Sequence, residues 1–131
     1  MPQLRISDAA TFLGVSDDTV RRLVDSGVLA AAIDESGRKV IDGLALAMYA
    51  RARAAAAAEP LGVSSSARNR FVGLVTEITS DEVMSQVELQ CGPYRVVSLL
   101  STEAVRDLNL EPGSVAVAVI KSTNVIVEVE R

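Results

Sequence analysis

The spacing of apolar residues changes near residue 60 and divides the chain into two parts. Before this point, apolar side chains recur every three or four residues, which is the pattern of one face of a helix. After it, they recur at every second position, as along a strand with one buried face. The chain is therefore expected to hold a mainly helical domain followed by a mainly β domain, an α+β organisation.

The sequence pattern of the first part predicts three helices and a small β-hairpin. The helices are expected to end at Gly14, at Gly27 and near Ala58, and their expected N-terminal caps are Ser7, Ser16 and Asp42. Between the second and third helices, two β-prone pieces at residues 30–33 and 39–41 flank a Ser-Gly turn. Two short helices followed by such a hairpin predict a small winged helix-turn-helix domain over residues 1–58.

The second part predicts five short strands and one small helix. The strands are expected at residues 72–78, 83–89, 94–100, 115–120 and 125–129, and the helix at residues 101–108. This content in about 65 residues fits an OB-like five-stranded β-barrel over residues 66–131. A linker is expected at residues 59–65, where Pro60 acts as a helix breaker.

The amino-acid composition limits the chemistry that the protein can perform. Histidine is absent and Cys91 is the single cysteine, so we expect no typical zinc, copper or haem site. A Ser–His or Cys–His nucleophilic pair cannot form within the chain. We therefore expect no catalytic residues, no metal and no enzymatic activity. No apolar run approaches the roughly 18 residues of a membrane span, and a single cysteine fits a cytoplasmic location.

The charge of the chain gives little support to nucleic-acid binding by itself. The formal net charge is −4. Residues 1–60 carry seven basic and eight acidic side chains, and residues 61–131 carry six and nine. Since neither part is basic overall, any contact with nucleic acid depends on where the cations are placed.

Two loops combine a cation with small hydroxyl residues at the edges of predicted strands. The candidate oxyanion ligands in these loops are Ser66, Ala67, Arg68, Lys121, Ser122 and Thr123. Backbone N–H groups, hydroxyls and fixed cations are the donors that a small tetrahedral oxyanion needs when no metal cation takes part. The same residues also fit a flexible serine linker and a polar hairpin turn that bind nothing, so the pattern alone leaves both interpretations open.

The second helix and the hairpin turn carry the candidate contacts to double-stranded DNA. These residues are Ser16, Asp17, Thr19, Arg21, Arg22, Arg38 and Lys39. Arg21 and Arg22 suit phosphate or guanine, and Arg38 with Lys39 would lie across the DNA backbone or the minor groove as a wing. The alternative is a small helical oligomerisation or protein-binding domain with scattered arginines, because a fold does not fix a function.

Residues 64–129 resemble the Mop class of TOBE domain. The resemblance is carried by the segments Ser66–Asn69, Leu110–Val117 and Val119–Val125. It implies binding of molybdate or tungstate by hydrogen bonds at sites between subunits, and a β-barrel that dimerises and sometimes assembles further. On this resemblance, the loop of Arg68 and the loop of Lys121 would converge across a subunit boundary to hold a small dianion.

One segment departs from the usual pattern of that family. Asp81 and Glu82 occupy the family's other anion-facing hairpin, where basic or neutral residues are common. Their carboxylates would repel an anion if they pointed into the site.

Residues 4–50 resemble the winged helix-turn-helix of the MerR/excisionase type. The pattern that carries the resemblance runs from Ala9-Ala10 through Leu13–Ser16 to Thr19-Val20, and Gly37-Arg38 follows in the wing. The resemblance implies binding to double-stranded DNA as a dimer or higher homo-oligomer, which the second domain would hold together.

These features together predict a cytoplasmic transcriptional regulator that responds to molybdate or tungstate. An anion-storage or buffering protein whose first domain only localises it is the main alternative. A purely architectural DNA-binding protein with a ligand-free barrel is a third. The sequence does not distinguish molybdate from tungstate, or activation from repression.

Overall fold

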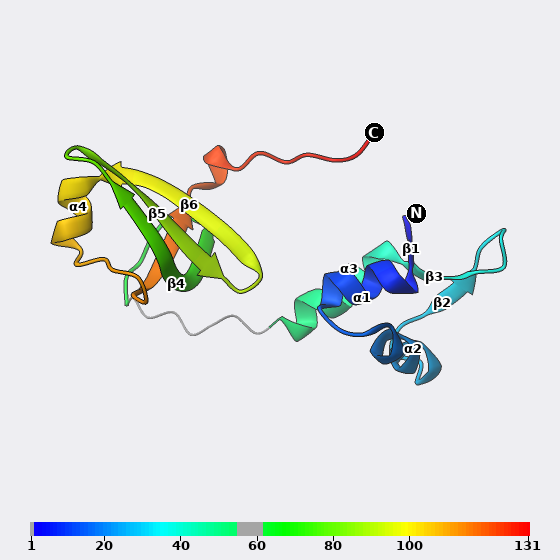
Figure 1. Cartoon of the computed structure of the whole chain (residues 1–131). Coiled ribbons are helices and arrows are strands. Elements are labelled where there is room, and N and C mark those ends of the chain that lie inside the picture. Colours follow the sequence, from blue (N-terminus) through cyan, green and yellow to red (C-terminus); the bar gives the residue numbers. More distant parts are fainter. Residues whose placement is uncertain (1, 55–61) are drawn as a thin grey trace. The chain divides into compact units, whose positions relative to one another are not determined.

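The computed structural model describes residues 2–54 and 62–131. The chain divides into two compact units, Met1–Ala55 and Ala56–Arg131, and each is described by itself (Figure 1). Two sequence expectations fall partly outside the described residues: the tail of the third helix toward Ala58, and linker residues 59–61 with Pro60. Within the described residues, no helix is long and apolar enough to cross a membrane.

The first unit is a winged helix-turn-helix, as predicted. Its elements are β1 (Gln3–Arg5), α1 (Ile6–Leu13), α2 (Asp17–Asp25), β2 (Ala31–Ile33), β3 (Lys39–Asp42) and α3 (Gly43–Arg53). The three strands form an antiparallel sheet in the order β1-β3-β2. The β2–β3 hairpin is the wing, and the Asp34 carboxylate fixes its turn by accepting hydrogen bonds from the N–H groups of Ser36 and Arg38, both at 2.9 Å.

Side-chain caps explain where α2 and α3 begin, but not where α1 begins. Ser16 Oγ accepts from the Thr19 N–H at 3.2 Å, and Asp42 Oδ2 accepts from the Ala45 N–H at 3.0 Å, which confirms both predicted caps. The prediction for Ser7 is wrong, because α1 already begins at Ile6 and Arg5 holds the cap position without a side-chain hydrogen bond. Strand β1, which the sequence did not predict, ends at Arg5 and leads directly into the helix.

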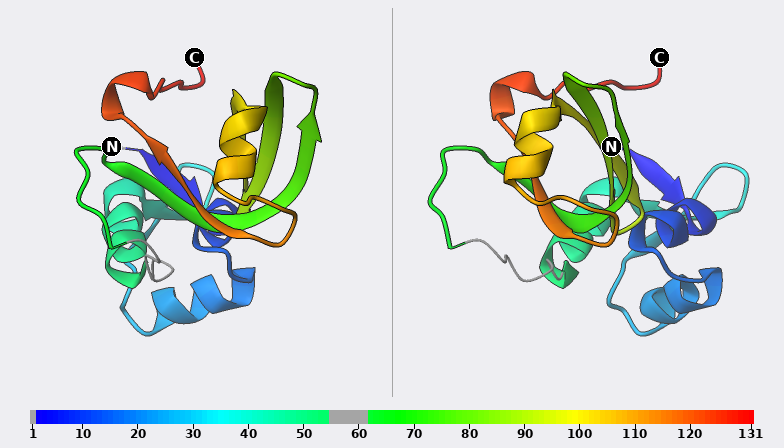
Figure 2. Two further views of the ribbon diagram at one scale, coloured as in Figure 1. Left: turned by 90° about the vertical axis from the view of Figure 1, so that its left-hand side faces the viewer. Right: turned by 60° about the vertical axis from the view of Figure 1, so that its left-hand side comes forward.

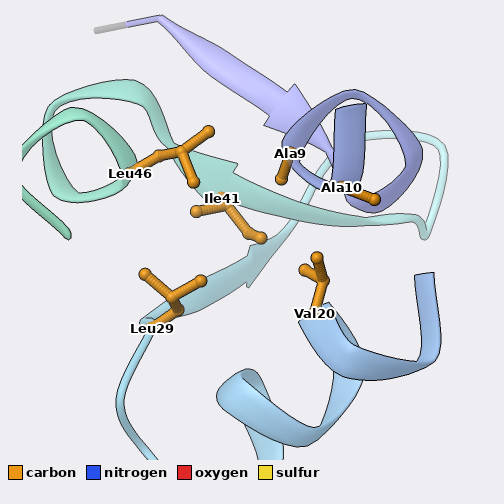
Figure 3. Close-up of a cluster of buried hydrophobic side chains, with 6 residues drawn as sticks. All are labelled: Ala9, Ala10, Val20, Leu29, Ile41 and Leu46. Carbon is orange, nitrogen blue, oxygen red and sulfur yellow. The ribbon is translucent and has the colours of Figure 1, made fainter. Parts of the chain in front are cut away.

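A small apolar core holds the helices of the first unit against β3. Figure 3 shows its six buried side chains, Ala9, Ala10, Val20, Leu29, Ile41 and Leu46. The two alanines let α1 lie close to β3, where Ile41 is fully buried. This core fixes the N-terminus of α2 relative to the wing.

The second unit is a curled antiparallel sheet with one helix (Figures 1 and 2). Its elements are β4 (Asn69–Ser80), β5 (Met84–Cys91), β6 (Tyr94–Ser101), α4 (Thr102–Asp107), β7 (Val115–Ile120) and the 3-10 turn η1 (Ser122–Asn124). The strand order is β6-β5-β4-β7. An irregularity in the β4–β5 register between Val75 and Glu77 bends the long strand β4, as a curled sheet requires. The OB-like fold predicted from the sequence is confirmed.

The fifth strand of the predicted barrel is not formed within one chain. Residues 125–131 have no strand partner among the residues that the structure describes, and they run from η1 away from the sheet (Figure 1). The prediction of a strand at residues 125–129 is therefore wrong for the single chain. The physical reason is that the sheet ends at β6 on one side and at β7 on the other, and the segment pairs with neither edge.

Gly73 is required where β4 passes over β5. A β-carbon at this position would lie 2.6 Å from the Gln90 carbonyl oxygen and 2.5 Å from Cys91 Sγ. Both distances are shorter than any ordinary van der Waals contact, so a side chain would force the two strands apart. The glycine thus allows the close approach on which the core of Val75, Val87, Leu89, Cys91 and Val105 depends.

A buried hydroxyl network joins the β4–β5 hairpin to α4. Ser85 is 1% exposed, and its Oγ lies 2.7 Å from Ser80 Oγ and 2.8 Å from Thr102 Oγ1. The Thr102 hydroxyl donates in turn to the Asp81 carbonyl oxygen at 2.9 Å. Each buried polar atom of the network therefore has a partner, as a buried hydroxyl needs.

Replacing Ser85 by alanine should lower the free energy of unfolding by about 1–3 kcal/mol, because the buried Thr102 hydroxyl loses a partner. Urea unfolding of the full chain measures the change. Ser64→Ala, which removes an exposed hydroxyl from the same unit, is the matched control and should leave the midpoint unchanged. An unchanged midpoint for Ser85→Ala would show that the network does not stabilise the hairpin.

Candidate functional site

The β4–β7 ladder brings the two candidate oxyanion loops to one end of the second unit. Asn69, the first residue of β4, pairs with Ile120, the last residue of β7. Arg68 and Lys121 are the residues that directly flank this pair. The Asn69 side chain also donates from Nδ2 to the Ile120 carbonyl oxygen at 3.1 Å, so the loops are tied together where they leave the sheet.

Within one chain, the loops of Arg68 and Lys121 leave neighbouring strands at the same end of the sheet. Their convergence across a subunit boundary, which the family resemblance implies, stays a prediction. Figure 2 shows the start of β4 beside the end of β7, which leads into η1. The reason is the antiparallel pairing of these two strands, which are 51 positions apart at Asn69 and Ile120.

The first loop is anchored by a buried alanine between two exposed residues. Ala67 is 8% exposed, whereas Ser66 and Arg68 are exposed to solvent. The Ala67 N–H donates to Ser65 Oγ at 3.1 Å. Ala67 is one of the candidate oxyanion ligands, but its N–H is already engaged by Ser65, whose side chain would have to turn away before an anion could use that N–H.

The second loop presents a cation at the start of a short helical turn. Lys121 is exposed and precedes η1, and its carbonyl oxygen accepts from the Asn124 N–H at 2.9 Å. Ser122 and Thr123 are also exposed. The first N–H groups of a helical turn have no partner within the turn itself. Hydroxyls, N–H groups and two cations at one sheet end can hold a small dianion without a metal.

The acidic hairpin lies at the other end of β4 from the two loops. Asp81 follows the last residue of this strand of 12 residues, which at about 3.3 Å each separates the ends by up to roughly 40 Å. Asp81 Oδ1 accepts from the N–H groups of Val83 and Met84 at 2.8 and 2.7 Å. These backbone hydrogen bonds, that of Met84 first, lower the pKa of the Asp81 carboxyl from its ordinary value. Within one chain, the carboxylate closes its own hairpin and does not face Arg68.

The first unit holds a second cluster, a hollow between the start of α2 and the wing. Its volume is about 360 Å³, and it is lined by Arg5, Ile6, Ser7, Asp17, Arg21, Arg38 and Lys39. Four of the predicted DNA contacts, Asp17, Arg21, Arg38 and Lys39, are thus brought together. Sequence reasoning missed Arg5 and Ser7. The pairing of β1 with β3 places Arg5 beside the wing, and Ser7 follows in the first turn of α1.

The remaining predicted DNA contacts lie outside this hollow. Ser16 and Thr19 hold each other at the cap of α2, with their hydroxyl oxygens 3.0 Å apart. Arg22 is exposed in the last turn of α2. Ser16 and Thr19 are therefore occupied in forming the helix end, whereas Arg22 is open to solvent.

No group of three or more His, Cys, Asp or Glu side chains that could hold a metal ion occurs in the described part of the chain, residues 2–54 and 62–131. This finding concerns metal ions alone. The donors at the end of β4 and β7 are of the kind that suits an oxyanion.

Comparison with known proteins gives matches to two families. Residues 65–127 match the family described as TOBE domain, and residues 4–54 match the family described as helix-turn-helix domain. A probable molybdenum-pterin-binding protein of Haemophilus influenzae is 44% identical over 66 residues, which are 50% of this chain and 96% of that protein. The molybdenum transport protein ModE of Herbaspirillum seropedicae is 36% identical over 67 residues, which are 50% of this chain and 25% of ModE. The solved structure of a molybdate-binding protein from Sporomusa ovata is 29% identical, with 50% of this chain and 98% of that chain covered and a TM-score of 0.49.

Proposed function

Because this chain belongs to the TOBE domain family and carries a helix-turn-helix domain ahead of its TOBE domain, we propose that it is a molybdate-responsive DNA-binding regulator of transcription. The observation that carries the proposal is the pairing of Asn69 with Ile120, which sets the loops of Arg68 and Lys121 side by side. The names of the relatives, molybdenum-pterin-binding protein and ModE, support molybdenum oxyanions as the ligand class. Binding to a DNA operator requires a cytoplasmic location, which is part of the proposal.

The proposed ligand is a tetrahedral dianion. Arg68 and Lys121 supply two positive charges, which match the two negative charges of molybdate. The hydroxyls of Ser66, Ser122 and Thr123 can rotate to donate, and each oxygen of the anion can accept more than one hydrogen bond. Tungstate has nearly the same size and the same charge, so it is the second ligand that we expect at this site.

We propose that the chain forms a dimer in which the C-terminal segment of each copy supplies the missing fifth strand of the other copy's barrel. An apolar groove of about 540 Å³ runs between β6 and β7, and its lining includes Val96, Leu100, Val117 and Val119. In the C-terminal segment, Val125, Ile126, Val127 and Val129 are 45–85% exposed. Alternate residues of an extended segment share a face, so Val125, Val127 and Val129 would enter the groove of the partner together.

Such a dimer would also suit DNA recognition. A helix-turn-helix of this size makes few contacts by itself, and a two-fold dimer doubles them on a palindromic site. The linker that would transmit ligand binding to the DNA-binding unit remains a prediction, because residues 55–61 are not described.

An anion-storage protein is the second candidate. One specific observation favours it: half of this chain covers 96% of the Haemophilus influenzae relative, so a protein of that kind needs no helix-turn-helix. The helix-turn-helix domain, with its cationic hollow, has no role in storage and favours the regulator.

Titration of the full chain onto a labelled duplex from the upstream region of its own gene, with and without 100 µM molybdate, tests the proposed function. We expect the apparent DNA affinity to change at least about fivefold, the lower end of typical coupling between sites. Sulfate at the same concentration is the control and should have a smaller effect. Molybdate binding by calorimetry without any DNA binding would favour storage, and DNA binding that ignores molybdate would favour an architectural protein.

A further inference from the structure

The hollow in the first unit draws its cations from three separate elements. Arg5 ends β1, Arg21 lies on α2, and Arg38 with Lys39 belongs to the wing. All four are exposed, although the residues 1–60 around them are slightly acidic overall. Four cations gathered around one concavity create a local positive field that the net charge does not reveal.

Two of these cations form ion pairs with acidic neighbours, and the other two form none within the described part of the chain. Arg21 pairs with Asp18 at 3.1 Å, and Arg38 Nε lies 3.8 Å from Asp34. Among residues 2–54 and 62–131, Arg5 and Lys39 take part in no ion pair. The pKa of the Asp34 carboxyl is lowered first by the backbone hydrogen bond from Arg38 and, in smaller part, by the charge of Arg5. The hollow therefore combines two ion-paired guanidinium groups with two cations that form no ion pair among the described residues.

We propose that this hollow seats one backbone phosphate of double-stranded DNA, with Arg5 and Ser7 as phosphate contacts outside both the second helix and the wing. The inference rests on the proposed DNA-binding function and deepens it. A phosphate lies on the ridge that borders the major groove. The hollow borders the N-terminus of α2, which is the end of the helix that faces the bases in a helix-turn-helix.

The partner residues of the hollow fit a phosphate better than a base edge. Arginine gives a two-pronged set of donors that matches phosphate oxygens, and the Ser7 hydroxyl in the first turn of α1 can add another. Asp17 is the one carboxylate in the lining. Its carboxylate repels the phosphate, and so it lowers the affinity of the hollow for DNA of any sequence.

The test measures binding of the full chain to two labelled duplexes of equal length, by fluorescence anisotropy over a range of salt. One duplex comes from the upstream region of its own gene, and the other is a scrambled version. A phosphate contact carries no sequence information, so Arg5→Ala should weaken binding to both duplexes equally, by roughly fivefold to tenfold at low salt. The slope of log affinity against log salt should fall by about 0.9.

Matched variants keep this result specific. Arg51→Ala removes one exposed arginine from α3 in the same unit and should change the affinity less than about twofold. Arg5→Lys keeps the charge and should retain the salt slope. Asp17→Asn should strengthen binding to both duplexes. Thermal unfolding shows whether Arg5→Ala is folded, and if it is not, Arg5→Gln takes its place.

Several results would overturn the inference. Arg5→Ala could bind both duplexes as Arg51→Ala does, or it could lose affinity for the upstream duplex alone, which would make Arg5 a base contact. If the hollow were a site for small anions, 10 mM inorganic phosphate would displace the DNA more strongly than chloride does at equal ionic strength. Absence of DNA binding by the wild-type chain would remove both this inference and the proposed function. If DNA binding depends on Arg5 but does not change with molybdate, the proposed function is excluded and the phosphate site in the hollow is retained.

Discussion

Replacing Lys121 by alanine should weaken molybdate binding by between about tenfold and a hundredfold. The ammonium group is one of two cations that the β4–β7 ladder brings to the same end of the sheet. A charge-assisted hydrogen bond contributes about 1.5–3 kcal/mol, which corresponds to this change in the dissociation constant. Arg68→Ala should have an effect of similar size. Calorimetric titration of the full chain with molybdate measures both.

Two variants show whether this loss is specific to the site. Arg106→Ala removes an exposed cation from α4 in the same unit, and it should bind molybdate as the wild type does. Lys121→Arg keeps the charge and should bind better than Lys121→Ala. Wild-type affinity in both Lys121→Ala and Arg68→Ala would place the anion elsewhere or exclude it from this protein.

A carboxylate at position 127 should dissociate the proposed dimer into monomers. In the proposed dimer, Val127 lies in the partner's apolar groove with Val125 and Val129, whereas Ile126 lies on the opposite face of the segment. Burial of one such side chain contributes about 1.5–3 kcal/mol, and it occurs twice in the dimer. Since the new carboxylate must also lose its hydration, Val127→Asp should raise the dimer dissociation constant more than about a hundredfold.

The neighbouring residue supplies the control. Ile126→Asp introduces the same charge one position away on the opposite face, and it should weaken the dimer much less. Sedimentation equilibrium over a range of concentrations measures both variants. Equal behaviour of the two variants would mean that the segment does not pair as a strand, and a wild type that is monomeric at every concentration would exclude the dimer.

Elements with a local signal could be predicted from the sequence. Ser16 and Asp42 are cap residues followed by helical periodicity, and the alternation along β4, β5, β6 and β7 is long enough to identify each strand. Ser7 has the same chemistry as Ser16, but the pairing of Arg5 with Val40 extends β1 to the point where α1 begins. A tertiary contact over 35 positions thus overrode a local capping preference.

The candidate site shows the same division between local and long-range signals. Ser66, Arg68 and Lys121 could be selected because a cation beside hydroxyl residues is a local pattern. The register that joins their loops within one chain depends on Asn69 and Ile120, and no local pattern encodes it. Arg5 was not predicted as a site residue because its position depends on long-range strand pairing as well. The strand predicted at residues 125–129 has the right apolar alternation, but it has no strand to pair with in the described part of a single chain.

The C-terminal segment has a consequence for how the protein responds to dilution. In the proposed dimer the last strand of each unit comes from the other molecule. Such a unit folds by a bimolecular step, so its melting temperature rises with total protein concentration. Cellular copy number would then set how many molecules have a complete barrel. At low expression the chain would exist largely as open monomers, each with an uncovered apolar groove and a free β-edge, features that favour aggregation.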